Sequence, residues 1–160
     1  MTRYITLQEY FWLAEQVTGN EAAVLARVAR ADLADSALHA PSAGIEAQDF
    51  YPDVIDKAAV LTCRLAWNHP LPDGNKRAAW AALLMFVDLN GGVWDPDPPN
   101  VDDAESAMLA VAAHTVDEKW FASWLGDRVR FAKIGPPPAA IEGARPLSED
   151  LDEMRRDERP

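Results

Sequence analysis

The chain has 160 residues, 49% of them hydrophobic, which is enough for one domain with its own core. Its formal net charge of −11 argues against a general nucleic-acid-binding protein, because affinity for the phosphate backbone needs a basic surface. The single cysteine, Cys63, excludes an internal disulfide, and its apolar surroundings predict a core residue. No signal peptide opens the sequence and no apolar run is long enough to cross a bilayer, so we expect a soluble, cytoplasmic protein.

Amphipathic spacing and cap signals predict that most of the chain is helical. The turn formers over 40–50 predict a loop or a small hairpin, and the proline-rich stretch 94–99 predicts a loop. In chain order, helices are expected over residues 6–17, 21–30, 32–39, 53–67 and 75–89, then after residue 100 and from 115 to about 130.

Particular residues are expected to begin and end these helices. Two Thr-x-x-Glu patterns, Thr6–Glu9 and Thr115–Glu118, match the capping box. Asn20 and Asn100 are expected N-caps, and Gly19 is expected to end the first helix.

Of two neighbouring helices, the second is expected at the centre of the fold. Pro52 suits a helix first turn, and the helix after it carries Val54, Ala58, Leu61 and Leu65 on one face. The helix over 75–89 is apolar nearly all round, so it should lie buried in the middle of a bundle. The predicted fold class is all-α, with six or seven helices, a central buried helix and a small β-hairpin.

The most informative stretch is His69-Pro-Leu-Pro-Asp-Gly-Asn-Lys-Arg77, a polar loop that leads into the first turn of the buried helix. His69 can take a proton from a hydroxyl near neutral pH. Asp73 is a hard oxygen ligand that suits Mg²⁺, and Gly74 permits a tight turn.

The next three residues, Asn75, Lys76 and Arg77, combine an amide and two cations with the open N–H groups of a helix start, an arrangement that suits a phosphate. Each residue alone is compatible with a plain turn or cap. Their joint order indicates phosphoryl or nucleotidyl transfer, in which catalysis is mostly positioning and charge neutralisation.

This stretch resembles the signature loop of the Fic/Doc (Fido) superfamily, His-x-Phe-x-Asp/Glu-Gly/Ala-Asn-Gly/Lys-Arg. Lysine before the arginine is the form of the death-on-curing (Doc) toxins of toxin–antitoxin modules. The resemblance extends to Ala34–Pro41 and Gln48–Asp53, and it covers roughly residues 4–131. A Fido domain over 1–131 is therefore expected, with Leu71 anchoring the loop where the family has an aromatic residue.

The resemblance implies a role for each polar residue of the loop. His69 would be the general base toward a target hydroxyl, and Asp73 would bind Mg²⁺. The ATP phosphates would be held by Gly74, Asn75, Lys76 and Arg77.

The resemblance also implies an activity. In Fic adenylyltransferases a glycine stands where Lys76 is, and the lysine fills room needed by the inner phosphates. We therefore expect a Doc-like toxin that transfers the γ-phosphate of ATP to a hydroxyl of a translation factor, with elongation factor Tu as the expected target, and so inhibits protein synthesis. Protein adenylylation is the alternative enzyme activity, and a catalytically silent binding module is the alternative of another class.

Two further segments carry expectations. Ser42, Ala43, Gly44 and Ile45 match the position of the family's flap, which registers the target peptide by strand addition, although a mere connecting loop is the alternative. Residues 132–160 form a proline-rich spacer and a charged tail. Because Doc toxins are neutralised by the C-terminal helix of a Phd-type antitoxin, a helix over 148–156 could act as a built-in inhibitor; a disordered tail is the alternative. Expected partners are a Phd-type antitoxin and the target, with no direct nucleic acid and no membrane.

Overall fold

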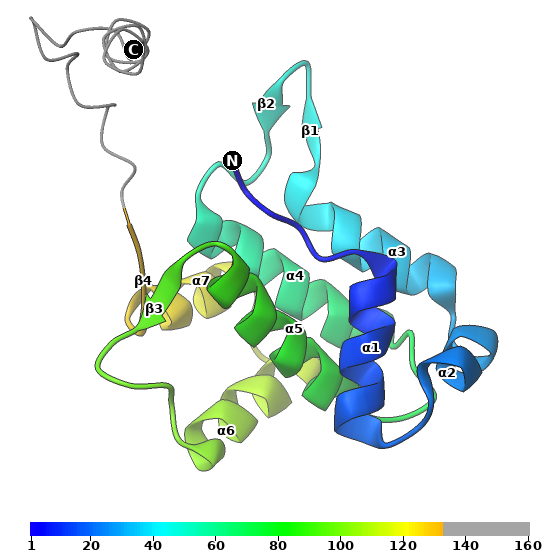
Figure 1. Cartoon of the computed structure of the whole chain (residues 1–160). Coiled ribbons are helices and arrows are strands. Elements are labelled where there is room, and N and C mark those ends of the chain that lie inside the picture. The colour runs from blue at the N-terminus through cyan, green and yellow to red at the C-terminus, as the bar shows by residue number, and fades with distance from the viewer. Residues whose placement is uncertain (133–160) are drawn as a thin grey trace, which may run out of the picture.

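The computed structural model describes residues 1–132 and shows a helical bundle with two small antiparallel strand pairs (Figure 1). The expected tail beyond Ala132, with its helix over 148–156, lies outside the described residues. The elements are α1 (Leu7–Thr18), α2 (Ala22–Val28), α3 (Ala31–His39), the 3-10 helix η1 (Ala40–Ser42), β1 (Gly44–Ile45), β2 (Gln48–Asp49), α4 (Val54–Asn68), α5 (Asn75–Leu89), β3 (Gly92–Trp94), α6 (Val101–Ala112), α7 (Glu118–Gly126) and β4 (Val129–Phe131).

The centre of the bundle is the pair α4 and α5, whereas the sequence predicted a single central helix over residues 75–89. Helix α4 is enclosed by α3, α5, α6 and α7, so Ala58, Leu61 and Leu65 are buried and the predicted Val54 is half-buried. Helix α5 buries Phe86 completely, although Leu84 is exposed. The central buried helix is confirmed, and α4, with nine buried residues against six in α5, is the more enclosed of the two because four helices pack around it.

The buried cysteine confirms the expectation for Cys63, which is fully enclosed in α4. Burial, together with the charge of Glu118, raises the pKa of the Cys63 thiol to about 12. The thiol therefore stays protonated at neutral pH and packs as an apolar group.

Some caps agree with the sequence. The capping box at Thr6 and Glu9 is present, Gly19 ends α1 in the left-handed conformation, and Asn100 accepts a hydrogen bond from Asp103 N at 2.8 Å. The expected cap at Asn20 is wrong, because Glu21 occupies the N-cap position of α2 without a side-chain bond.

Two other helix starts also differ from expectation. At α7, Asp117 caps Trp120 N instead, and the Thr115 hydroxyl donates to Ala110 O. Pro52 lies outside α4, whose N-cap is Asp53, because helical residues begin only at Val54.

A second strand pair was not predicted. Gly92–Trp94 pairs with Val129–Phe131, so residue 94 belongs to a strand and α7 ends at Gly126 rather than near residue 130. Strands of three residues show no periodicity that sequence inspection can detect, and the partner is far away along the chain. This pair fixes the segment after α5 against the end of the described chain.

The expected hairpin is present as β1 and β2, and a buried lysine ties it to the bundle. Lys57 is 1% exposed, and its Nζ donates to Asp49 Oδ2 and to the Pro41 carbonyl, each at 3.0 Å. Burial lowers the pKa of Lys57, but hydrogen bonds to Asp49 and Tyr4 raise it above the ordinary value. The ammonium group thus joins both η1, which precedes the hairpin, and strand β2 to α4.

We expect Lys57→Met to lower the free energy of unfolding by about 2 kcal/mol, because two charge-assisted hydrogen bonds are lost while the apolar stem is kept. Urea unfolding measures this loss. Lys119→Met, at an exposed position on α7, is the matched control. An equal effect of the two substitutions would contradict a structural role of the buried ammonium.

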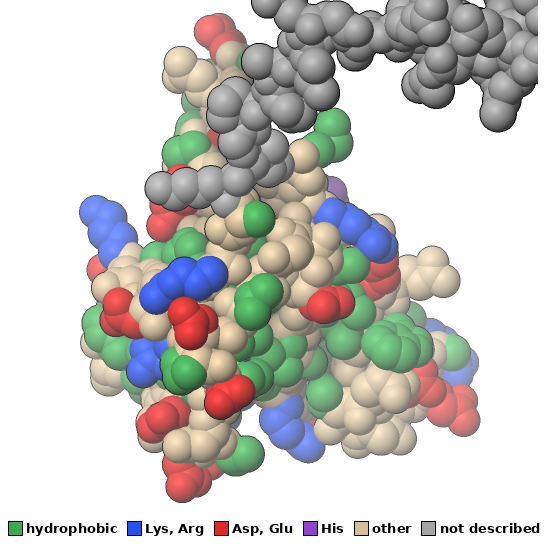
Figure 2. All heavy atoms as spheres, turned by 60° about the vertical axis from the view of Figure 1, so that its left-hand side comes forward, with side chains coloured by type: hydrophobic (Ala, Val, Ile, Leu, Met, Phe, Trp, Pro, Cys, Tyr) green, Lys and Arg blue, Asp and Glu red, His purple; other side chains and the backbone are tan. Residues whose placement is uncertain are grey.

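The surface carries both signs of charge. On the face shown in Figure 2, Lys and Arg side chains lie scattered among Asp and Glu rather than in one basic patch. Within residues 1–132, no helix combines the length and the apolar character that crossing a membrane would require.

Candidate functional site

The candidate site is the loop between α4 and α5, and its backbone is specified by unusual conformations at both ends. His69 ends α4 in the left-handed conformation, with φ 46° and ψ 55°. A residue other than glycine pays about 1 kcal/mol for this conformation, so surrounding contacts must hold it. Gly74, with φ 79°, begins α5. Pro70 and Pro72 exclude helix in between.

Inside the loop, two hydrogen bonds join the backbone of Leu71 to the side-chain amide of Asn75. Asn75 Oδ1 accepts from Leu71 N, and Asn75 Nδ2 donates to Leu71 O, each at 2.9 Å. Leu71 is 3% exposed, so it anchors the loop in the core as expected. The Asn75 amide, which was expected to meet phosphate oxygens, makes these two hydrogen bonds within the loop, and its second Nδ2 hydrogen and its backbone N–H remain available for an anion.

No side chain caps the first turn of α5, where the loop enters the helix. Gly74 has no side chain to cap the first-turn N–H groups, so these donors and the helix dipole face outward. A Cβ atom at Gly74 would lie 2.8 Å from Thr18 Cγ2 and 3.3 Å from Arg77 Nη2. A side chain at this position would therefore be strained by the backbone conformation and crowded by Thr18 and Arg77.

Arg77 and Lys76 place positive charge beside these N–H groups. Arg77 Nη1 donates to the Val17 carbonyl at 3.0 Å, which orients the guanidinium from α1. Arg77 Nη2 lies 4.0 Å from Asp73 Oδ2, a loose pair between two exposed side chains. Lys76 is exposed. Loose, exposed charges of this kind can turn toward an incoming anion at little cost.

The structure brings the predicted loop residues to one hollow of about 280 Å³. Its lining comprises His69, Pro72, Asp73, Gly74, Asn75, Lys76 and Arg77. A second hollow, of about 500 Å³, shares His69 and Asn75 and is lined further by Val28 and Arg30. His69 thus lines both hollows.

The residues present fit a magnesium ion of the kind that accompanies a nucleotide. The Asp73 carboxylate is 93% exposed beside the hollow. Among the described residues, no group of three or more His, Cys, Asp or Glu side chains could hold a metal. Mg²⁺ in proteins commonly takes one or two carboxylates and completes its shell with phosphate oxygens and water, so a single carboxylate is compatible with it.

The predicted flap residues do not lie at this site. Ser42, Ala43, Gly44 and Ile45 stand just before the start of α4, whereas His69 stands at its end. A helix of 15 residues is about 22 Å long. The hairpin and the loop are therefore at opposite ends of α4 (Figure 1).

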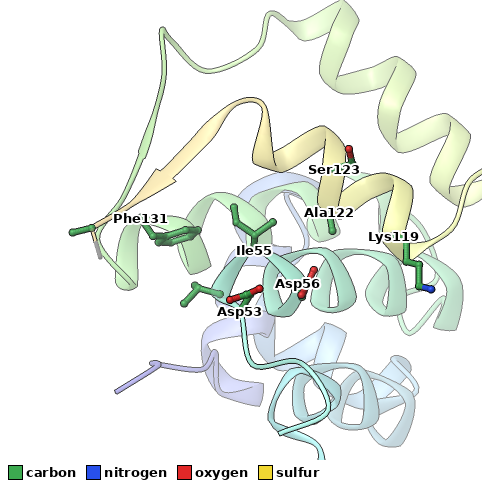
Figure 3. A pocket seen from close by; sticks show the side chains of 9 residues that line it. Asp53, Ile55, Asp56, Lys119, Ala122, Ser123 and Phe131 are labelled. Atoms are coloured by element: carbon green, nitrogen blue, oxygen red, sulfur yellow. The ribbon is translucent and has the colours of Figure 1, made fainter. Parts of the chain in front are cut away.

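A hollow of about 640 Å³, larger than the two at the loop, lies elsewhere (Figure 3). It lies where the start of α4 meets α7 and β4, and Asp53, Asp56 and Phe131 line it. Burial and the charge of Asp53 raise the pKa of Asp56. No histidine or cysteine lines this hollow, so size alone does not mark the site.

Two contacts of the loop could not be read from the sequence. Arg30 donates to the His69 carbonyl, and Val17 accepts from Arg77. Both partners come from ordinary positions near helix ends, and only the tertiary packing of α1, α2 and α3 brings them to the loop.

Comparisons with known proteins agree with this site. A family model described as the Fic/DOC family matches residues 4–87, which include the whole loop. The chain is 36% identical over 135 residues to a protein of Mycolicibacterium smegmatis named Toxin Doc, an alignment that spans 84% of this chain and 100% of the relative.

Proposed function

Because the chain belongs to the Fic/DOC family, we propose that it is a Doc-like toxin that transfers the γ-phosphate of ATP to a hydroxyl group of a translation factor. The expected target is elongation factor Tu, and the expected consequence is inhibition of protein synthesis. The observation that carries the proposal is the hollow in which a histidine, an exposed carboxylate, two cations and an open helix start meet.

The roles follow from the chemistry of phosphoryl transfer. His69 takes the proton of the attacking hydroxyl, whose oxygen forms a bond to the γ-phosphorus while the bond to the bridging oxygen breaks and ADP leaves. Lys76, Arg77 and the first-turn N–H groups of α5 bind the phosphates. Asp73 would hold Mg²⁺, which neutralises phosphate charge when bound.

The preference for phosphate over AMP rests on Lys76. A lysine fills space that a glycine would leave for the inner phosphates, and this favours a nucleotide that presents its γ-phosphate. We expect Lys76→Gly to shift the product toward transfer of AMP, as read by the mass added to the target. Lys76→Gln keeps the bulk and serves as the control. A glycine variant that still adds phosphate alone would contradict the steric argument.

The test of the proposal is intact-mass analysis of elongation factor Tu after incubation with the protein, ATP and Mg²⁺. One added phosphate, absent with His69→Asn, supports the kinase. An added AMP would mean adenylylation, the alternative that the same loop permits. No added mass, with toxicity that persists in the histidine variant, would mean a binding module without chemistry.

The relative's name also bears on partners. A toxin of a toxin–antitoxin module needs an antitoxin, and we propose a Phd-type antitoxin for this chain. Co-expression with such a protein should restore growth of cells that produce this chain.

A further inference from the structure

We propose that Arg30 is a positioning residue that holds His69 in its left-handed backbone conformation and so aims the imidazole at the hollow. This inference rests on the proposed function of His69 as the general base. It concerns a residue outside the signature loop, located between α2 and α3.

Arg30 binds two consecutive backbone carbonyls just after the end of α4. Arg30 Nη2 donates to the His69 carbonyl at 2.8 Å, and the Arg30 backbone N–H donates to the Pro70 carbonyl at 2.8 Å. Both carbonyls have left the helix and need donors from elsewhere. One residue therefore supplies the partners of the two peptide groups that directly follow His69, the first of which fixes the ψ angle of His69.

A neighbouring contact strengthens the same junction. Asn68 Nδ2 donates to the Leu33 carbonyl of α3 at 3.0 Å, one residue before His69. After His69, the two hydrogen bonds between Leu71 and Asn75 fix the rest of the loop. The backbone on both sides of His69 is thus held, while within the described chain no hydrogen bond engages its exposed imidazole.

The positive charge of Arg30 lies at the C-terminal end of α4, where it is favourable. A guanidinium at the C-terminal end of a helix interacts favourably with the helix dipole, and its planar donors match carbonyl oxygens. Arg30 is also exposed and lines the second hollow, so its removal leaves no cavity in the core. Its contribution therefore lies in orientation rather than in packing.

The experiment compares Arg30→Gln and Arg30→Lys in the full chain. Arg27→Gln is the matched control, because Arg27 lies in the last turn of α2 and is exposed. With ATP and elongation factor Tu, we expect Arg30→Gln to lower kcat about 10- to 100-fold, the effect of a displacement of about 1 Å at a reacting group. The KM for ATP should stay within about twofold, since the phosphate-binding groups are untouched. Arg30→Lys, which keeps a donor, should recover part of kcat.

A second readout does not depend on activity. In the free protein, the imidazole NMR signals of His69 should shift or broaden in Arg30→Gln, while those of His39 and His114 stay in place. If the wild type transfers nothing, the proposed function fails, and the NMR comparison still decides the positioning role. Unchanged His69 signals would overturn the inference, as would a higher KM for the acceptor at constant kcat, which would make Arg30 a substrate contact.

Discussion

Replacing His69 with asparagine should lower the rate of phosphate transfer by about 10²- to 10⁴-fold, the usual contribution of a general base. Asparagine tolerates the left-handed conformation that His69 adopts, so the loop backbone should persist and ATP should still bind. The measurements are kcat by intact mass and the Kd for ATP by calorimetry. Loss of transfer with retained ATP binding is the expected pair of results.

The chain offers a matched control for this variant in His114. It is also a left-handed, exposed histidine, with φ 55°, whose ring centroid lies 4.9 Å from that of Trp67, and it lines neither hollow at the loop. His114→Asn should keep full activity. If both variants lose activity equally, the effect comes from the backbone or the fold rather than from the base at the site.

Replacing Asp73 with asparagine should lower transfer by about 10²- to 10³-fold, because the carboxylate that would hold Mg²⁺ is lost where phosphate charge must be neutralised. The fold should be unaffected, because the side chain is 93% exposed and its pair with Arg77 is long, at 4.0 Å. Activity measured over a range of Mg²⁺ concentrations checks this expectation. The variant should need far more Mg²⁺ or fail at any concentration.

Asp88→Asn is the control for the metal argument, because Asp88 is exposed near the other end of α5. It should leave the Mg²⁺ dependence unchanged. A normal Mg²⁺ dependence in Asp73→Asn would instead show that the ion is held by other groups, and the assignment of Asp73 would fall.

The loop was predictable because its parts are adjacent in the chain. Residues 69–77 connect two apolar helices, so their clustering follows from a turn and a helix start, without any knowledge of distant contacts. The helices themselves followed from apolar spacing and caps. The buried position of Cys63 followed from the same pattern.

What the sequence missed depends on partners far along the chain. The pairing of Val93 with Arg130 joins two segments that carry no local strand signal. The role of Arg30 depends on α2 and α3 docking beside the end of α4. The distance between the hairpin and His69 follows from α4 being a straight rod between them, which a position in a motif does not reveal.

Helix α1 and Arg30, which follows α2, both contact the loop, and these contacts have a consequence for fragments of the chain. The Val17 carbonyl, the Thr18 methyl group and Arg30 all belong to the first thirty residues. A fragment that starts at residue 31 would contain every signature residue yet lack the groups that support His69, Gly74 and Arg77. We therefore expect the proposed activity to need the assembled chain, and the nine-residue signature alone should not work when it is transplanted to another helix pair.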